Sequence, residues 1–329
     1  MSFNPSILSS SVGALVGAYL TQLNSFDMIF NHIDMRMNLT SKERTAMKLR
    51  NKYASSQQDL ITFSPNQVPE EMKGLWFRPY TIIEKVRLDN GPKVSNLAYG
   101  SYFGGDTDLI ELKNGWDVVF SGYAAYNGSH QSYNGISIYQ NGAQLGATAT
   151  LYKNNFFTAL TSNVGASIGE ASTMYGQEDF TMLGTGIASK TGYNFEFNEG
   201  KFIIQPNYLM SYSFINTFDY TNAAGVKIQS DPLHAIQFAP GVKFIANYKN
   251  GWQPYASVQM VWNILDSTRF RANDVSLPRM SIDPYVQYGI GVQKRWGDRF
   301  TGFFQSMIRN GGRTGIALTT GFRWALDKD

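Results

Sequence analysis

The chain of 329 residues is 43% hydrophobic, 14% aromatic and 16% charged, and its net charge at pH 7 is +3. It contains no run of about 18 apolar residues, the least that a membrane-spanning helix needs, so any membrane crossing must use β-strands. The small net charge argues against nucleic-acid binding, and the absence of cysteine excludes disulfides and thiolate metal sites.

Two helices are predicted in the N-terminal part of the chain. Apolar residues recur at steps of three and four and form one stripe of the first helix, namely Leu23, Phe26, Phe30, Ile33 and Met37. A polar stripe with the same spacing runs beside it, namely Asn24, Asp27, Asn31, Asp34 and Asn38. Thr40 and Glu43 have the spacing of a capping box, which predicts a second helix through about Tyr53.

The segments on either side of these helices carry weaker signals. Residues Met1 to Leu23 contain no Lys or Arg and do not match a secretory signal peptide. Gly13 and Gly17 have the small-xxx-small spacing of paired membrane helices, in an apolar segment too short to span a bilayer. Residues 57–71 contain two prolines and predict an extended connector. We therefore expect residues 1–72 to form a helical segment and connector.

From Gly74 onward the sequence alternates apolar and polar residues, which is typical of β-strands with one apolar face. In the segment from Trp252 to Ile264, the even positions are apolar and most odd positions are polar. At about 3.3 Å per residue and a tilt of about 45°, Trp252 and Trp262 lie roughly 23 Å apart, close to the height of about 25 Å of a membrane barrel's apolar band. We predict an aromatic girdle at Trp116, Trp252, Trp262 and Trp324.

Turn signals divide residues 73–329 into strands. Short turns are predicted at 113–116, 153–155, 198–201, 249–252 and 296–299, and longer loops at 88–96, 127–134, 173–179, 217–231, 266–280 and 309–313. Short turns and longer loops alternate, so eleven connections imply about twelve antiparallel strands with both ends on the short-turn side. This sorting of loops by length favours an all-β transmembrane barrel over a soluble β-sandwich.

The last strand carries the most specific motif. Its polar, glycine, aromatic and hydrophobic residues resemble the terminal insertion signal of outer-membrane proteins, namely Thr319, Gly321, Phe322, Trp324 and Leu326. That resemblance implies the barrel assembly machinery as a partner. Such proteins usually end on an aromatic residue, whereas this chain continues to Asp329, and an ordinary amphipathic strand is the alternative.

The order of the parts resembles the translocator domain of autotransporters, which belong to type V secretion. The resemblance runs from about residue 4 to residue 326 and includes Trp76–Tyr80, Gly100–Asp106, Pro284–Gly291 and Gly321–Trp324. It implies a twelve-stranded barrel in the outer membrane of a Gram-negative-type bacterium, with an α-helix threaded through its lumen. Its function would be to anchor and to export or display an N-terminal passenger, which is absent from this chain, so we expect the chain to be part of a longer precursor.

The first helix is the expected lumen helix. A helix is about 10 Å across and crosses about 30 Å of membrane with roughly 20 residues. Its polar stripe would face polar lumen side chains, and its apolar stripe would meet lumen aromatics such as Tyr255 and Tyr285. A surface or periplasmic amphipathic helix is the alternative. Some members of the family cleave themselves at an asparagine in this helix, and Asn24, Asn31 and Asn38 could attack their own backbone, although no local motif matches.

Enzymatic and other functions have less support in the sequence. The chain has three histidines, and His234 beside Ser230 and Asp231 is the nearest approach to a triad, but neighbours on a loop rarely form one. We therefore predict no catalytic site, no metal site and no cofactor, and interpret Asp106 and Asp108 as a solvated turn, with a rim of the barrel as the alternative. The alternative functions are a stand-alone porin and an adhesin or receptor barrel. The expected partners are membrane lipid, the assembly machinery and the passenger, with no nucleic acid.

Overall fold

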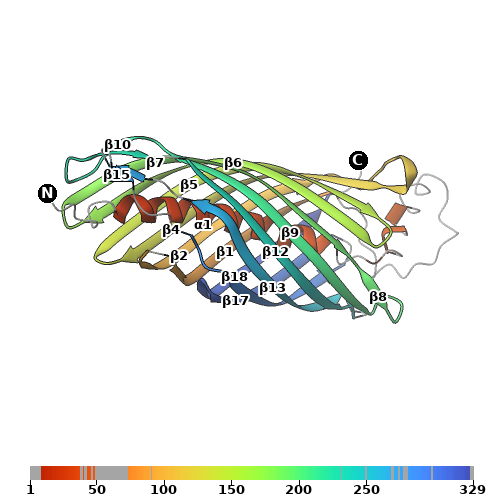
Figure 1. Ribbon diagram of the computed structural model, residues 1–329. Helices are drawn as coiled ribbons and strands as arrows, with labels where there is room; N and C mark the ends of the chain where they lie inside the picture. The colour runs from red at the N-terminus through yellow and green to blue at the C-terminus, as the bar shows by residue number, and fades with distance from the viewer. Residues whose placement is uncertain are drawn as a thin grey trace.

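The computed structural model describes residues 9–37, 40, 43–45, 47–48, 73–89, 91–230, 232–248, 250–267, 270–272, 275–276, 281–297 and 299–326. Twelve long antiparallel strands form a closed barrel around one helix (Figure 1). The strands are β1 (Gly74–Arg87), β2 (Lys93–Asp106), β4 (Asp117–Tyr133), β5 (Ile136–Lys153), β6 (Phe156–Thr173), β7 (Gly176–Tyr193), β9 (Phe202–Thr217), β12 (Leu233–Ala246), β13 (Trp252–Ser267), β16 (Tyr285–Trp296), β17 (Phe300–Gly311) and β18 (Arg313–Ala325). The predicted fold class is confirmed.

The barrel closes between its first and last strands. β1 pairs with β18 from Gly74 opposite Ala325 to Val86 opposite Arg313, so neither strand leaves an open edge. Two short strands extend the same sheet, with β3 (Ile110–Glu111) on β4 and β8 (Phe195–Phe197) on β9. A separate small sheet contains β10 (Tyr220–Thr221), β11 (Lys227–Ser230), β14 (Phe270–Ala272) and β15 (Val275–Ser276).

Side chains alternate between the lumen and the exterior along every long strand, as a barrel requires. In β13, Trp252, Val258 and Met260 are exposed, whereas the intervening Gln253 and Tyr255 are buried. The apolar face therefore points outward, toward lipid, and the polar face points into the lumen. This orientation agrees with the alternation expected for the segment from Trp252 to Ile264.

The short turns use residues that tolerate a left-handed backbone. Asn114 and Gly115 have φ angles of 65° and 75° in the 3-10 turn η2 (Lys113–Gly115), where Asn-Gly was predicted to reverse the chain. Three of the predicted longer loops are wrong. Residues 127–133 belong to β4, and only Asn134 and Gly135 connect it to β5. Likewise β6 and β7 meet across residues 174–175, and β17 and β18 across Gly312.

The helix α1 (Ser9–Met37) lies along the barrel interior (Figure 1). Its 29 residues correspond to roughly 44 Å at 1.5 Å per residue, enough to cross the apolar band. Among the described residues, no helix is both long and apolar enough to span a membrane. The predicted capping box is present, because Thr40 N donates to Glu43 Oε2 at 2.7 Å and Glu43 N donates to Thr40 Oγ1 at 3.1 Å.

Candidate functional site in the barrel lumen

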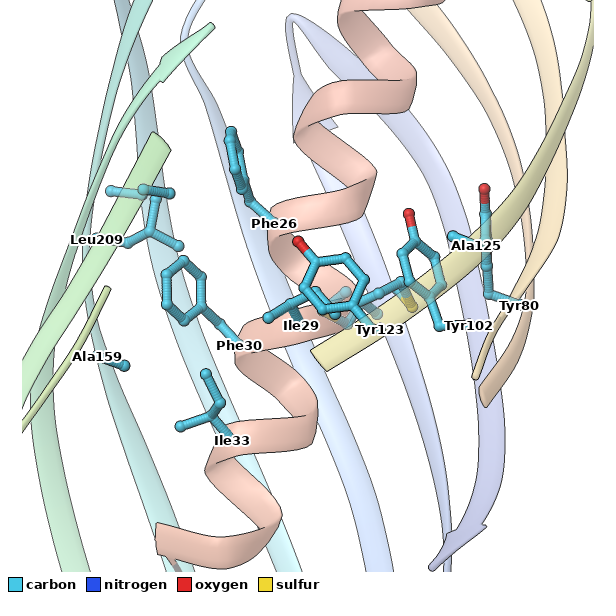
Figure 2. Packing of buried hydrophobic residues seen from close by; sticks show 14 of the residues in the cluster. Phe26, Ile29, Phe30, Ile33, Tyr80, Tyr102, Tyr123, Ala125, Ala159 and Leu209 are labelled. Carbon is cyan, nitrogen blue, oxygen red and sulfur yellow. The ribbon is translucent and has the colours of Figure 1, made fainter. Parts of the chain in front are cut away.

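The apolar stripe of α1 packs against aromatic side chains of the barrel wall. Figure 2 shows Phe26, Ile29, Phe30 and Ile33 among wall residues that include Tyr80, Tyr102, Tyr123, Ala159 and Leu209. The tyrosine hydroxyls retain polar partners, since Tyr80 and Tyr102 both donate to Asn127 Oδ1, at 2.7 and 3.2 Å. Tyr285 belongs to this cluster, whereas Tyr255 packs with Ile203 and Ile245 in a separate one. Burial of this stripe therefore fixes one side of the helix against the wall.

The polar stripe of α1 meets arginines of the last two strands. Arg309 Nη2 donates to Asp27 Oδ2 at 3.1 Å, and Arg313 Nη2 donates to Asn24 Oδ1 at 2.8 Å. Both guanidinium groups also bind Glu84 of β1, with Arg313 doing so through two bonds of 2.9 and 2.7 Å. The two arginines and Glu84 have fully buried side chains. Buried charges are tolerated because each is paired and hydrogen-bonded.

About two turns further along α1, Asp34 forms a second ionic contact. Lys190 Nζ of β7 lies 2.7 Å from Asp34 Oδ2, and Lys243 Nζ of β12 lies 3.7 Å from the same oxygen. The Lys243 ammonium is also 4.2 Å from the centre of the Tyr255 ring. Tyr255 therefore lies near Asp34 of α1 and makes a cation–π contact with Lys243. This differs from the expected contact between Tyr255 and the apolar stripe.

The opposite side of the helix carries His32, which contacts the acidic end of β2. His32 Nε2 lies 3.0 Å from Asp106 Oδ2, and Ser121 Oγ donates to Asp106 Oδ1 at 2.8 Å. The His32 ring stacks on Trp76 with the ring centroids 4.1 Å apart. Asp106 is buried, so its interpretation as part of a solvated turn is wrong. Its burial follows from its position at the end of β2, where it points into the lumen and meets α1.

Amide and hydroxyl groups join the N-terminal half of α1 to β5 and β6. Ser25 Oγ donates to Gln144 Oε1 at 2.7 Å, Gln144 Nε2 donates to Gln22 Oε1 at 2.9 Å, and Gln22 also bonds Asn163. Gly13 and Gly17 face the wall here. A Cβ on Gly17 would lie within 1.9 Å of Gln131 Nε2. The glycine spacing thus allows the helix to approach β4 and β5, rather than a second helix.

Two cavities flank α1 inside the barrel. The first has a volume of about 40 Å³ and lies beside Ala18, Thr21 and Gln22. The second, also of about 40 Å³, lies beside Asn31 and Asp34. The side-chain amide nitrogen of Asn31 has no hydrogen-bond partner among the described residues. Self-cleavage at Asn24 or Asn31 stays a prediction, and Asn38 lies outside the described residues.

The segment after α1 contacts the short-turn end of the barrel. The Arg44 guanidinium lies 5.4 Å from the centre of the Tyr152 ring, and it donates to the Asn154 carbonyl oxygen. Lys48 Nζ is 2.5 Å from Asp117 Oδ2, and Glu43 Oε1 is 3.7 Å from Arg295 Nη1. The helix α1 therefore fills the lumen, and the segment after it contacts the barrel wall at the short-turn end.

On the exterior, the predicted girdle tryptophans take different positions. Trp252 and Trp324 are exposed near the short-turn end, Trp116 is half-buried there against Phe156, and Trp262 lies ten residues further along β13, half-buried. On β18, Phe322 and Trp324 point outward and Thr319 points inward. Gly321 lies beneath the Phe303 ring, and Leu326 follows the end of the strand.

The described residues contain no group of three His, Cys, Asp or Glu side chains placed to hold a metal ion. His234 faces outward, and its Nδ1 lies 2.7 Å from the Tyr212 hydroxyl. Sequence reasoning found the helix side of the ionic contacts but missed the wall side. The available signal was Lys or Arg at inward positions of strands whose apolar and polar residues alternate, namely Arg78, Lys190, Lys243, Arg309, Arg313 and Arg323.

A closed barrel with an apolar exterior and a polar lumen filled by its own N-terminal helix defines an outer-membrane β-barrel with a plugged pore. Residues 75–305 match the family described as the autotransporter beta-domain, and the chain belongs to this family. This family's barrels are translocator domains of the Gram-negative outer membrane, which anchor and export or display an N-terminal passenger. The comparison with curated protein sequences found no match.

Solved structures of autotransporter domains have similar folds. The transport unit of AIDA-I from Escherichia coli is 14% identical, with a TM-score of 0.68, and the match covers 88% of this chain and 100% of that one. The β domain of Bordetella BrkA is 16% identical, with a TM-score of 0.64 and coverage of 78% and 100%. The translocator domain of NalP from Neisseria meningitidis is 11% identical, with a TM-score of 0.63 and coverage of 91% and 98%.

Proposed function

We propose that the passenger of this translocator is exported through the lumen and that α1 then remains there as a plug. The observation that carries this proposal is the match of charges between helix and wall. Asp27 meets Arg309 at 3.1 Å, and Asp34 meets Lys190 at 2.7 Å. A helix that merely passed through the lumen would not need an opposite charge on the wall at each of its acidic residues. The role of the barrel is transport and anchoring, without catalysis in this chain.

The barrel offers the passenger a passive polar path, which by itself gives transport no direction. Folding and membrane assembly supply that direction. Asn24, Asp27, Asn31 and Asp34 form the polar side of the plug, and the predicted Asn38 lies outside the described residues. Residues 1–72 serve as plug and connector, and residues 73–329 as the membrane anchor.

Removal of the plug tests this function directly. A variant lacking residues 1–60 should conduct ions steadily in planar bilayers, whereas the full chain should stay mostly closed. A stand-alone porin predicts open channels in both, so equal conductance of the two proteins would contradict the plug. A sharper variant is Asp34→Asn, which leaves Lys190 and Lys243 facing a neutral side chain and should increase the frequency of opening. Glu170→Gln, an exposed position on the outer surface of β6, is its control.

We also propose that Thr319, Gly321, Phe322, Trp324 and Leu326 form the insertion signal that the barrel assembly machinery reads. Trp324→Ser should lower the amount of folded barrel in cells while leaving refolding into detergent unchanged, because detergent requires no machinery. Trp252→Ser removes another exposed tryptophan at the same end and is the matched control. An equal loss of folded barrel for both variants would indicate that Trp324 acts only as a girdle residue.

A further inference from the structure

The outer surface near the short-turn end carries an unusual row of side chains. Cross-strand neighbours run from β13 through β16, β17 and β18 to β1, in the order Trp252, Lys294, Gly302, Phe322 and Phe77. Beneath this row, nearer the turns, Trp296, Phe300 and Trp324 are neighbours in the same way. Glycine thus stands at the centre of a surface that is otherwise built from large rings and one lysine.

The missing side chain at Gly302 makes this surface concave. A Cβ at this position would lie 2.7 Å from the Trp296 ring, so glycine lets the indole lie over the sheet. The groove around it has a volume of about 500 Å³. Its rings brace one another, with centroid distances of 5.4 Å for Trp296–Phe300 and 5.8 Å for Phe300–Phe322. The volume of the groove is within the range of about 300–1,000 Å³ found for small-molecule sites.

Lys294 is the one charged side chain among the described residues that line the groove. Its ammonium lies 5.0 Å from the centre of the Trp252 ring and donates to the Asn250 carbonyl oxygen at 2.5 Å. An ammonium has three donors, so two N–H groups remain for an acceptor at the rim of the groove. An apolar floor with a cation at one edge matches an amphiphile that has an anionic head.

We propose that this groove binds one phospholipid, with an acyl chain over Gly302 and the phosphate at Lys294. The location of the groove indicates which ligand it binds. The groove faces outward from the barrel, toward the hydrocarbon chains of the lipids, and it lies at the level of the exposed Trp252, Trp296 and Trp324. Tryptophan gathers where headgroups meet acyl chains, so Lys294 lies at phosphate depth on the short-turn side.

Native mass spectrometry of the delipidated full chain in detergent, titrated with dioleoyl-phosphatidylglycerol, tests the site. Wild type should retain one lipid, and Lys294→Met should lower its affinity by roughly fivefold, the contribution of one cation near a phosphate. Lys153→Met is the matched control, because the Lys153 ammonium lies 5.4 Å from the Trp116 ring at the same end and Lys153 does not line this groove. That control should bind as wild type does.

Two further arms separate the headgroup from the chain. Dioleoylglycerol, which lacks the phosphate, should bind wild type and Lys294→Met equally. Val292→Trp should fill the groove and abolish retention, whereas Ile308→Trp, at an exposed position on β17, should not. Equal losses for Lys294→Met and Lys153→Met, unchanged binding by Val292→Trp, or retention of a second protein copy in place of lipid would overturn the proposal. Heat-modifiable migration in gels verifies that each variant is folded.

Discussion

Glu84 joins the start and the end of the barrel to the helix. It lies on β1 and accepts hydrogen bonds from Arg309 and Arg313 of the last two strands, which in turn reach Asp27 and Asn24. All three members of the central group are fully buried, so each charge depends on the others for compensation. The group therefore stabilises both the seam between β1 and β18 and the position of α1.

Glu84→Gln should lower the free energy of unfolding by about 3 kcal/mol, because it leaves two buried guanidinium groups without their shared carboxylate. Urea titration of the barrel in lipid vesicles measures this change. Glu170→Gln alters an exposed carboxylate whose partner is Gln177, and it should shift stability by less than about 0.5 kcal/mol. If both variants unfolded at the same urea concentration, Glu84 would have no special role in the seam.

The sequence predicted the helix residues of these contacts and not their partners. Asp27 and Asp34 lie on one stripe of a helix, and the spacing that shows this extends over only two turns of the chain. Arg309 is 282 residues away from Asp27, and its inward direction depends on the register of β17. Register is fixed by pairing between strands, which a single strand's alternation leaves open. The wall partners therefore became visible only in the folded barrel.

At the scale of the elements, the N-terminal half of α1 depends on two glycines. Gly13 and Gly17 bring its backbone against Tyr133, Gln131 and Gln140 of β4 and β5, where a side chain would collide. Ala18 follows directly, yet it lines the cavity of about 40 Å³ beside Thr21 and Gln22. Adjacent positions of one helix thus face a packed wall and a small cavity.

Gly17→Leu should push this half of the helix away from the wall and raise amide hydrogen exchange around residues 10–20 by roughly tenfold, from an overpacking cost of about 1–3 kcal/mol. Ala18→Leu adds the same side chain one residue later and should leave exchange close to wild type, since the cavity can hold it. Exchange measured by mass spectrometry on the folded barrel compares the two. Equal exchange in both variants would show that the wall yields at Gly17.

The errors at the scale of elements concern loops, and they have a common cause. Asn127, Ser129 and Gln131 suggested a polar loop, but they are inward residues of β4 and face a polar lumen. In a soluble sheet, polarity on both faces indicates a loop, whereas a barrel with a polar lumen places such residues within strands. The predicted number of strands was still correct, because each wrongly predicted loop contained a chain reversal.

The whole molecule has two unequal ends. β4 has 17 residues and β5, β6 and β7 have 18 each, whereas β16 and β17 have 12. A tilted strand crosses a membrane with about 9–11 residues, so the long strands extend beyond the apolar band. In Figure 1 they reach further than β17 and β18 toward the end where α1 begins. We therefore expect the end where α1 begins to stand out from the membrane on the passenger side, and the short turns to lie on the other side.

This orientation can be read in intact cells, because the chain has no native cysteine and a single introduced thiol reports its own side. Met174→Cys, at a tip that is 80% exposed between β6 and β7, should react with a membrane-impermeant maleimide in intact cells. Lys113→Cys, in the exposed turn η2, should react only after the outer membrane is permeabilised. Labelling of Lys113→Cys in intact cells, or of Met174→Cys only after permeabilisation, would contradict the orientation in which α1 leads toward the cell surface and the short turns face the periplasm.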